Sequence, residues 1–459
     1  MAEKSSEAGS SASTSVMPSS RLGRFMKLSA LSAGASTRYV GQLVRGVFQD
    51  KESREASLFQ AHLTTVREAV EVMDQLKGAV MKVGQLISVT HEGGLLPPEL
   101  SEVFAKLQHQ ASTLPFPLIQ KRIEEELGKP LERVFEWLDE TPLAAASIGQ
   151  VHAAGLLSGQ PVVVKVQYPG VDESVESDLW HVRTLLKSTG LLGRSGEADL
   201  LFDEVRARML EELNYQEELQ NLQQFRAFFA HDARVLFPEP LASHCTRRLL
   251  VLSRIDGLTL EQALALHPEP GWRNRLGETL FELMLTQLAL FRTLHADPQL
   301  GNFRFLEDGR IILYDFGCVK RFDAPFLKPY LAMMDAGIRR DERGLAQAFE
   351  ALGILPPHHK EGLALLLRFC DLVFEPLRRS PYRFEEDAHI FKDVKRMATQ
   401  FLAWPEIQAH PDLVYLHRTY FGIYFILTRL RAEGDWQGIF YRLYAQAQTQ
   451  WQVSDDSSS

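Results

Sequence analysis

The chain has 459 residues, of which 45% are hydrophobic and 24% are charged, so it is long enough for two or three units and can bury a large core. Its formal net charge of -9 argues against a general nucleic-acid binder, whose surface would be basic. No CxxC or Cys/His cluster predicts a disulfide framework or a zinc site, and the sparse cysteines fit a reducing compartment. They are Cys245, Cys318 and Cys370.

The N-terminal region begins with residues 1–20, which are rich in serine and are predicted to be a disordered leader. Residues 21–54 form a basic amphipathic segment, in which the stretch from Arg21 to Phe48 holds five basic residues and no acidic one. Such a segment either lies on an anionic membrane surface or packs on its own domain. It also resembles the end of an organellar transit peptide, but no cleavage-like region precedes it. The sequence leaves the first two alternatives open.

Residues 55–132 are predicted to be a helical extension. From Glu55 to Val89, apolar residues recur at spacings of three and four, which is typical of a long amphipathic helix. No run of about 18 uninterrupted apolar residues occurs anywhere in the chain, so no transmembrane helix is predicted.

The rest of the chain changes from strands to helices. Residues 133–257 hold short strand-like segments such as "QPVVVKVQYP", interrupted by a helical insert over 171–230. Residues 258–451 are mostly helical, and residues 452–459 form a polar tail. A small sheet with one important helix, followed by a larger helical lobe, predicts an α+β fold of the two-lobed, protein-kinase-like type.

Lys165 ends the apolar stretch "VVVK". A lysine on a strand built for burial must direct its ammonium to a partner, because an unpaired buried charge is costly, unless the strand lies at an edge and the lysine points to solvent. Glu218 lies on a predicted helix, where its carboxylate could pair with Lys165 and orient it on nucleotide phosphates. Charged helix faces are otherwise usually solvent faces.

The stretch "AAASIGQVH" precedes this lysine at the place of a kinase Gly-rich loop, whose backbone N–H groups cover phosphate. Alanine resists positive φ angles, so the loop is expected to be stiffer than a glycine loop and to sit differently over a nucleotide. The predicted nucleotide-binding residues here are Ala144, Ala145, Ala146 and Ser147.

The stretch "HADPQLGNF" contains Asp297 and Asn302 at the HxDxxxxN spacing of a catalytic loop, and Asp315 opens "DFG" after a predicted strand. Mg²⁺ prefers oxygen ligands and usually takes one or two carboxylates together with phosphates. Asn302 and Asp315 are therefore the predicted metal ligands, and Asp297 is the predicted catalytic group that orients or deprotonates an acceptor. The ordered set of motifs predicts phosphate-transfer chemistry with ATP or ADP and Mg²⁺.

With these residues in hand, the chain resembles the UbiB/AarF-domain family of atypical kinase-like proteins, which support ubiquinone and other isoprenoid-lipid metabolism. The most specific mark is the KxGQ signature, formed by Lys82, Gly84 and Gln85. The resemblance implies that this helix folds over the active site, that Lys82 reaches Glu212 of the family's ExD motif, and that large protein substrates are excluded. Protein kinase activity is therefore not expected.

The sequence departs from the family pattern at three places. In the ExD motif, Asn214 replaces the second carboxylate, which removes a charge and is expected to weaken the grip on Lys82 or on a second metal. "QL" stands in the catalytic loop where "HP" is common, and Ser253 stands in the hinge-like strand where an acidic residue is common. The residues predicted to bind or transfer phosphate are all present. They are Lys165, Glu218, Asp297, Asn302 and Asp315.

Three functions follow from this reading. The first is an Mg²⁺-dependent ATPase or small-molecule or lipid-directed phosphotransferase that supports ubiquinone biosynthesis at a membrane surface, with a prenyl-lipid or phenolic ubiquinone precursor and biosynthetic enzymes as partners. The second is a nucleotide-responsive pseudokinase scaffold. The third is an aminoglycoside- or choline-type phosphotransferase, which would lack KxGQ. The expected location is the cytoplasm, peripheral to the inner membrane, with the mitochondrial matrix as the alternative.

Overall fold

The computed structural model describes residues 113–456, except 147, 174, 177–178, 181–182, 184–205, 207–208, 211, 386–389, 402–406 and 408–409. The predicted leader, the basic segment, the long amphipathic helix with its KxGQ signature, and Ser147 lie outside the described residues.

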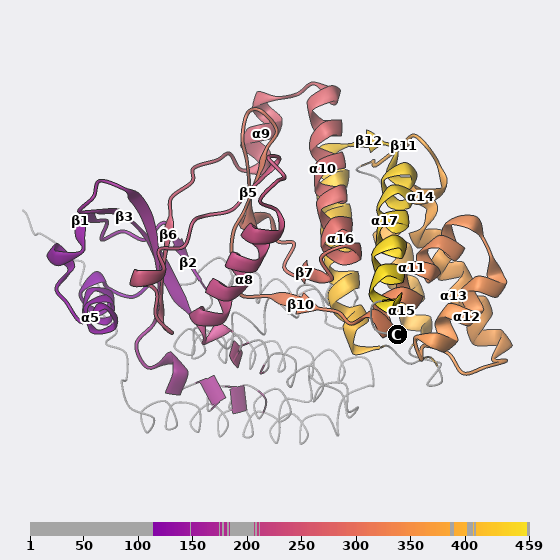
Figure 1. The fold of residues 1–459 in the computed structure, drawn as a ribbon, viewed down its shortest axis with the longest axis horizontal. Helices are drawn as coiled ribbons and strands as arrows, with labels where there is room; N and C mark the ends of the chain where they lie inside the picture. The colour runs from indigo at the N-terminus through magenta and orange to yellow at the C-terminus, as the bar shows by residue number, and fades with distance from the viewer. Residues whose placement is uncertain are drawn as a thin grey trace, which may run out of the picture.

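The described chain forms two lobes (Figure 1), with a sheet and α5 at one end and long helices at the other. The N-lobe sheet has the strand order β1-β3-β4-β6, and β2 pairs with β3. The pairings of β1, β2 and β4 with β3 and of β4 with β6 are antiparallel. The elements up to the end of this sheet are α5 (Phe116–Leu127), β1 (Phe135–Leu138), β2 (Ala144–Ala145), β3 (Gly149–Leu156), β4 (Pro161–Gln167), α8 (Tyr215–Phe228), β5 (Val235–Leu236) and β6 (Leu249–Ser253), with short 3₁₀ turns at Leu131–Arg133 and Ala242–His244.

The central strand β4 follows from its sequence. β-Branched valines favour a pleated surface, and alternate residues of a strand face opposite sides of the sheet. The valines at 162, 164 and 166 are fully buried and share a hydrophobic cluster with Ile119 and Ile123 of α5. Lys165 therefore projects from the other face, away from α5 and toward α8.

The C-lobe is mostly helical. It contains α9 (Leu260–Leu266), α10 (Pro270–Ala289), β7 (Thr293–His295), a 3₁₀ turn (Leu300–Asn302), β8 (Phe303–Phe305), β9 (Ile311–Leu313), β10 (Val319–Arg321), α11 (Ala324–Arg339), α12 (Glu342–Ala351), α13 (Lys360–Val373), α14 (Glu375–Arg378), β11 (Tyr382–Arg383), α15 (Ile390–Phe401), α16 (Pro411–Leu430), β12 (Glu433–Gly434) and α17 (Trp436–Asp456). Three small sheets join β7 to β10, β5 to β9 and β8, and β11 to β12.

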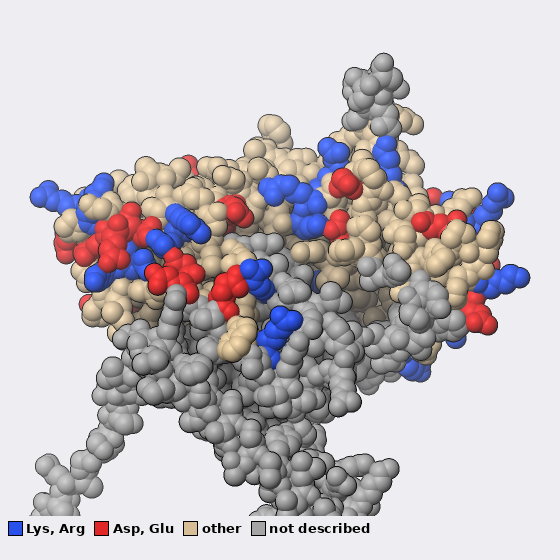
Figure 2. Space-filling view, turned by 90° about the horizontal axis from the view of Figure 1, so that it is seen from below, with Lys and Arg blue, Asp and Glu red and all other residues tan. Residues whose placement is uncertain are grey.

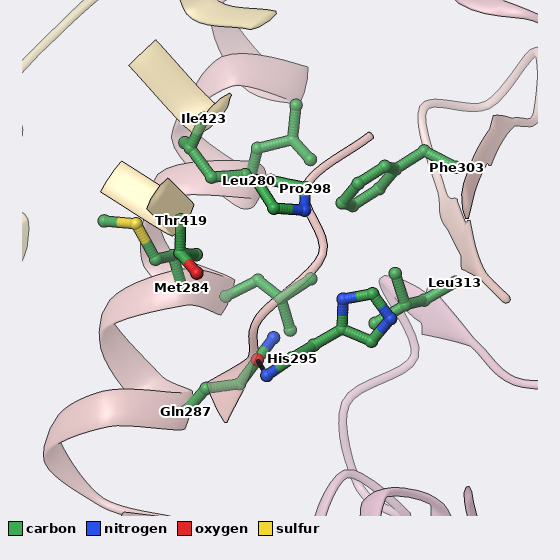
Figure 3. A pocket seen from close by; sticks show the side chains of 10 residues that line it. Leu280, Met284, Gln287, His295, Pro298, Phe303, Leu313, Thr419 and Ile423 are labelled. Carbon is green, nitrogen blue, oxygen red and sulfur yellow. Dashed lines mark hydrogen bonds between the residues drawn. The ribbon is translucent and has the colours of Figure 1, made fainter. Parts of the chain in front are cut away.

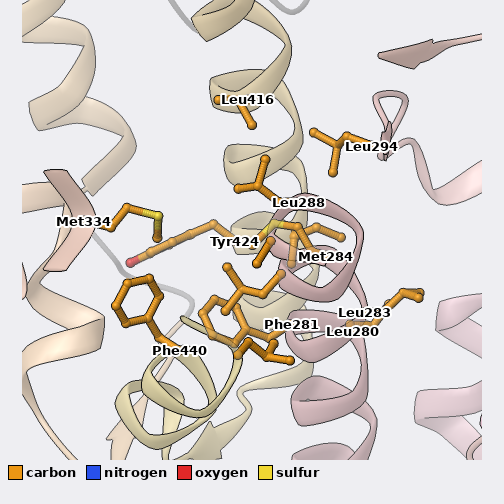
Figure 4. Packing of buried hydrophobic residues seen from close by; sticks show 14 of the residues in the cluster. Leu280, Phe281, Leu283, Met284, Leu288, Leu294, Met334, Leu416, Tyr424 and Phe440 are labelled. Atoms are coloured by element: carbon orange, nitrogen blue, oxygen red, sulfur yellow. The ribbon is translucent and has the colours of Figure 1, made fainter. Parts of the chain in front are cut away.

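The C-lobe core lies where α10, α16 and α17 meet. Figure 4 shows Phe281 and Met284 of α10 beside Tyr424 of α16 and Phe440 of α17. All four side chains are buried. The same cluster extends through Phe225 of α8, so the helix that carries Glu218 is packed on the C-lobe as well as on the sheet. The predicted α+β, two-lobed arrangement is confirmed.

Two further features of the described residues are the distribution of charge on the N-lobe and the hydropathy of the helices. Figure 2 shows acidic and basic side chains close to one another at the N-lobe end. Among the ion pairs of this lobe, Arg248 pairs with Asp172, and Lys121 pairs with Glu125 at 3.9 Å. Across the described helices, none combines the length and the hydropathy needed to cross a membrane.

Candidate active site

The centre of the site is an ion triad around Lys165. Its Nζ atom donates to Glu218 Oε1 at 2.8 Å and to Oε2 at 2.9 Å, and it also donates to Asp315 Oδ2 at 3.1 Å. The side chains of Lys165 and Glu218 are 13% and 6% exposed, whereas that of Asp315 is 43% exposed. The pair with Glu218 is thus the less screened one, and a ligand can reach Asp315 from solvent.

The charges of this triad shift one another's protonation. Burial raises the pKa of Glu218 to about 7, against the opposing effect of Lys165. Burial also acts to raise the pKa of Asp315, but Lys165 and the Gly317 amide outweigh it and lower that pKa to about 2. Burial acts to lower the pKa of Lys165, and the two carboxylates hold it well above its ordinary value. When two carboxylates share one ammonium, the pKa value of one rises and that of the other falls in this way.

Helix α8 presents Glu218 because its first turn is capped. The Oδ1 atom of Asn214 accepts from the Gln216 amide at 3.2 Å, and its Nδ2 atom donates to Glu217 Oε1 at 2.9 Å. An asparagine at this position satisfies a backbone N–H that has no partner within the helix. Asn214, which departs from the family pattern, is therefore the N-cap of the helix that carries Glu218.

Tyr215, the first residue of α8, places its ring under the lysine, with Lys165 Nζ 5.2 Å from the ring centroid. The tyrosine hydroxyl is buried and has no hydrogen-bond partner among the residues that the structure describes, and burial raises its pKa. The aromatic face thus adds a cation–π contact to the ion triad.

The segment that carries Asp315 is held in a left-handed turn. Asp315 has φ 55°, and its Oδ1 atom accepts from the Gly317 amide at 3.1 Å. A non-glycine residue in this region costs about 1 kcal/mol or more, and such strain collects at functional sites. The His295 ring, packed edge-on against Phe316 at 5.3 Å, contacts the Asp315 carbonyl through Nε2 at 2.7 Å. Because a carbonyl only accepts, Nε2 carries the proton.

Helix α8 is also tied to this segment. Asn221 donates through Nδ2 to the Phe316 carbonyl at 3.0 Å, and Phe225 packs against the Phe316 ring at 5.0 Å between centroids. Arg321 donates to the Asn221 side chain at 2.8 Å. These contacts hold α8 close enough for Glu218 to reach Lys165.

The catalytic-loop residues lie together, as their spacing predicts. Asn302 Nδ2 donates to the Asp297 carboxylate at 2.9 Å and to its backbone carbonyl at 3.1 Å. The other Asp297 oxygen accepts from the guanidinium of Arg418, which comes from α16. Sequence reasoning missed Arg418, because no motif marks it and 121 residues separate it from Asp297.

The hairpin of β2 and β3, which carries Ala144 and Ala145, lies in register with Lys165 of β4. Ala144 pairs with Val151, and Val151 pairs with Lys165, so two strand spacings, about 10 Å, separate Ala144 from Lys165 along one row of the sheet. The hairpin closes tightly, with the Ala146 amide donating to the Gly149 carbonyl at 2.8 Å. A Cβ at Gly149 would lie 2.2 Å from the Val166 carbonyl oxygen, so only glycine fits there.

The end of "AAASIGQVH" anchors the segment that leads in from the N-terminal extension. The side-chain Oε1 of Gln150 accepts from the Leu114 amide at 2.9 Å, and its Nε2 lies 2.7 Å from His152 Nε2. His152 Nδ1 lies 2.7 Å from the Asp139 carbonyl. Because that carbonyl only accepts, Nδ1 carries the proton. The amide nitrogen of Gln150 only donates, so His152 Nε2 accepts and the ring is neutral, and burial accordingly lowers its pKa. Gln150 and His152 therefore hold the backbone at Leu114 and Asp139 in place. They do not lie on the face of the sheet that carries Lys165, because Val151 pairs with that lysine.

Comparison with known proteins identifies the family. A family model described as the ABC1 atypical kinase-like domain matches residues 106–349, which is more than half of the chain. The chain belongs to this family. Its predicted relation to the UbiB/AarF kinase-like proteins is thereby confirmed, and it is an atypical kinase-like protein.

Two curated relatives of this ABC1 protein illustrate how far the similarity extends. "Atypical kinase COQ8, mitochondrial" from Saccharomyces cerevisiae is 29% identical over 94% of this chain and 86% of its own length. "Atypical kinase COQ8B, mitochondrial" from Rattus norvegicus is 30% identical over 74% of this chain and 64% of its own length. Among solved structures, the complex of Rv3197 with erythromycin from Mycobacterium tuberculosis matches with a TM-score of 0.57 at 24% identity, covering 86% of this chain and 98% of that one. This last likeness supports the fold.

The donor set of the ABC1 domain fits Mg²⁺ bound together with phosphate. The amide nitrogen of Asn302 donates to Asp297, so its side-chain carbonyl oxygen can bind a metal. Asp315 has a partly exposed carboxylate that can do the same. Within the described residues, no group of three His, Cys, Asp or Glu side chains could hold a metal alone. Mg²⁺ commonly keeps waters and takes one or two protein ligands plus substrate phosphates, so two oxygen donors suffice.

A cavity beneath the catalytic loop is too small for a substrate. Figure 3 shows His295, Pro298 and Phe303 around it, with Thr419 and Ile423 of α16 opposite. Its volume of about 10 Å³ has room for at most one water molecule.

The predicted residues divide into two groups. The structure brings Lys165, Glu218 and Asp315 together, and it brings Asn302 to Asp297. Glu212 is described, and its backbone carbonyl accepts from Gln167 Nε2 at 3.2 Å. Its predicted partner Lys82, with Gly84 and Gln85, lies outside the described residues.

Proposed function

We propose that this chain binds ATP with Mg²⁺ and either hydrolyses it or transfers its γ-phosphoryl group to a small acceptor. The observation that carries the proposal is the ion triad, in which Lys165 lies 2.8 Å from Glu218 and 3.1 Å from Asp315. Kinase-like sites use such a lysine on the nucleotide phosphates and such an aspartate on the metal. Here both groups are preassembled by α8 and by the turn at Asp315.

Each residue of the site then has a role in the transfer of the γ-phosphoryl group. An acceptor oxygen, from water or a small hydroxyl compound, forms a bond to the γ-phosphorus. The bond from that phosphorus to the bridging oxygen breaks, and ADP leaves with the electron pair. Asp297 takes the proton of the acceptor. Asn302 and Asp315 would hold Mg²⁺, which neutralises phosphate charge when it is bound.

The site's family supports a role in ubiquinone or other isoprenoid-lipid metabolism, with a prenyl-lipid or phenolic precursor as ligand and biosynthetic enzymes as partners. The relatives whose names place them in mitochondria are also named atypical kinases. We place the action of this chain at a membrane surface, reached through the basic segment at 21–54, whose charge and apolar residues suit anionic lipid.

The first test measures nucleotide binding. Mg²⁺-ADP should raise the thermal midpoint of the wild type, because a ligand held only by the folded state adds about 2.7 kcal/mol at 100 times its Kd. Asp315→Asn should lose this stabilisation. Asp308→Asn, at an exposed carboxylate paired with Arg310, is the matched control and should keep it. Full stabilisation of Asp315→Asn would refute the assignment of the metal and nucleotide site.

The second test measures hydrolysis by the purified full chain, with and without anionic liposomes and a phenolic mimic of a ubiquinone precursor. Activity that rises with lipid in the wild type and disappears in Asp297→Asn supports the lipid-linked enzyme.

One observation favours a scaffold instead: Lys165 and Asp297 are both already engaged by protein charges. A scaffold would bind nucleotide without releasing phosphate in any condition. The aminoglycoside- or choline-type alternative has less support, because the chain carries "KVGQ" at 82–85.

A further inference from the structure

Both oxygen atoms of the Asp297 carboxylate have protein donors. Oδ2 accepts from Asn302, and Oδ1 accepts from Arg418. The side chains of Arg418 and Asp297 are 16% and 19% exposed. A charge-assisted hydrogen bond with so little exposed surface is stronger than a surface ion pair, because solvent and salt screen it less.

The catalytic loop supplies no positive charge of its own. The residues from Ala296 to Phe303 read "ADPQLGNF", with no lysine or arginine. In phosphoryl transfer the moving group spreads negative charge over its oxygens, and the Asp297 carboxylate adds another negative charge beside it. A guanidinium stays charged at all relevant pH values and has five N–H donors, so one donor can hold Asp297 while others remain.

The helix that carries Arg418 is fastened to the loop at a second point. One turn along α16, a Cβ at Gly422 would lie 2.2 Å from Pro298 Cγ, so the glycine allows a close approach to the loop. Figure 3 shows Pro298 beside Ile423 of the same helix.

Near the start of α16, Asp412 pairs at 2.6 Å with Lys320, which follows the segment opened by Asp315. The ammonium of Lys320 also lies 5.1 Å from the ring centroid of Tyr415. Three contacts along one helix face therefore set the position of Arg418 relative to both halves of the site.

We propose that Arg418 is a positioning residue: it orients the Asp297 carboxylate toward the acceptor and supplies the positive charge that the catalytic loop lacks. This inference rests on the proposed function. Because Lys165, Asn302 and Asp315 hold nucleotide and metal without it, loss of Arg418 lowers kcat and spares nucleotide affinity.

The experiment uses the full chain with Arg418→Met and Arg418→Lys. For Arg418→Met, kcat for Mg²⁺-ATP should fall about 100-fold, the loss typical of one preorganised charge donor. The Kd for Mg²⁺-ADP, taken from the thermal stabilisation, should stay within about twofold, because it reports binding alone. The KM for ATP should do the same where ATP release is faster than the chemical step. Arg418→Lys should recover part of kcat, since it restores charge without the guanidinium geometry. The matched control is Arg429→Met on the same helix, at an exposed pair with Glu261, and it should leave all readouts unchanged.

A second measurement does not need turnover. Mg²⁺-ADP with aluminium fluoride mimics the transferring phosphoryl group, and the wild type should bind it more tightly than Mg²⁺-ADP. Arg418→Met should lose that difference. Unchanged or raised kcat in Arg418→Met, or an undiminished preference for the analogue, overturns the inference. In one outcome the wild type hydrolyses no ATP but still prefers the analogue to Mg²⁺-ADP, and Arg418→Met lacks this preference. The proposed enzymatic activity then fails, while the role of Arg418 stands. No preference in the wild type refutes both.

Discussion

The candidate site holds one cation–carboxylate centre around Lys165 and another around Asp297, and they are built differently. In the first, one buried ammonium serves two carboxylates from α8 and from the turn after β9. In the second, one carboxylate receives an amide from its own loop and a guanidinium from a distant helix. The first centre joins the two lobes, whereas the second lies wholly within the C-lobe. Loss of a charge should therefore cost stability at the first centre and turnover at the second.

The largest effect tests the first centre. Lys165→Met should lower the free energy of unfolding by about 3–5 kcal/mol, because it leaves two carboxylates near one another with their cation removed. Urea denaturation measures this. The double variant Lys165→Met/Glu218→Gln should recover part of the loss, since Glu218 is then neutral. Lys121→Met, at a side chain 76% exposed, is the control and should change stability by less than about 1 kcal/mol. A loss at Lys165 as small as the control's would remove the contrast between the centres.

The second effect is a pH dependence of the same centre. The pKa of Glu218 is raised to about 7 in the folded state, from 4.5. The folded chain then holds more protons than the unfolded chain between these values, so this contribution to stability is full below about pH 4.5 and is lost as pH rises through 7. Compared with Glu218→Gln, the wild type should lose up to about 3 kcal/mol over this range. Urea denaturation at a series of pH values checks it, and parallel curves for the two proteins would contradict it.

The third effect tests the second centre. Gly422→Ala places a methyl group against Pro298 and should cost about 1–3 kcal/mol through overpacking. It should also lower kcat, because α16 and Arg418 move away from Asp297. Thermal unfolding and Mg²⁺-ATP hydrolysis measure the two changes. Gly271→Ala, in the first turn of α10, is the matched control: among the described residues, its Cβ would meet only the flexible end of Arg275, at 3.7 Å. That variant should be neutral or slightly stabilising.

The smallest effect concerns the helix that delivers Glu218. Asn214→Ala should cost about 1 kcal/mol, because the Gln216 amide loses its cap. Asn214→Asp keeps an acceptor at the same place, so its thermal midpoint should stay close to that of the wild type. Equal losses in the two variants would show that Asn214 does not act through the cap.

How far sequence reasoning reached can be seen at individual residues. Asp297 and Asn302 share one short loop, and their spacing alone indicated a catalytic loop, whereas the hydrogen bond between their side chains is seen in the structure. Lys165 and Glu218 are 53 residues apart, and their pairing was predictable only because a buried lysine demands a partner. The cap at Asn214 carried a readable signal, since Asn214 stands three residues before Glu217 at the start of a helical pattern. The family pattern instead makes the same residue a weakened carboxylate motif, and that comparison hides its role as a cap.

The sequence by itself determined the strand pattern around Lys165, the loop and turn that hold Asp297, Asn302 and Asp315, and the order of a sheet lobe before a helical lobe. These follow from local spacing and from burial, which act along the chain. Only the tertiary structure decided that Arg418 joins Asp297, because an exposed-looking arginine on a helix finds its partner through the packing of α16 on the catalytic loop. That packing depends on Gly422 admitting Pro298, a contact between residues more than 100 positions apart.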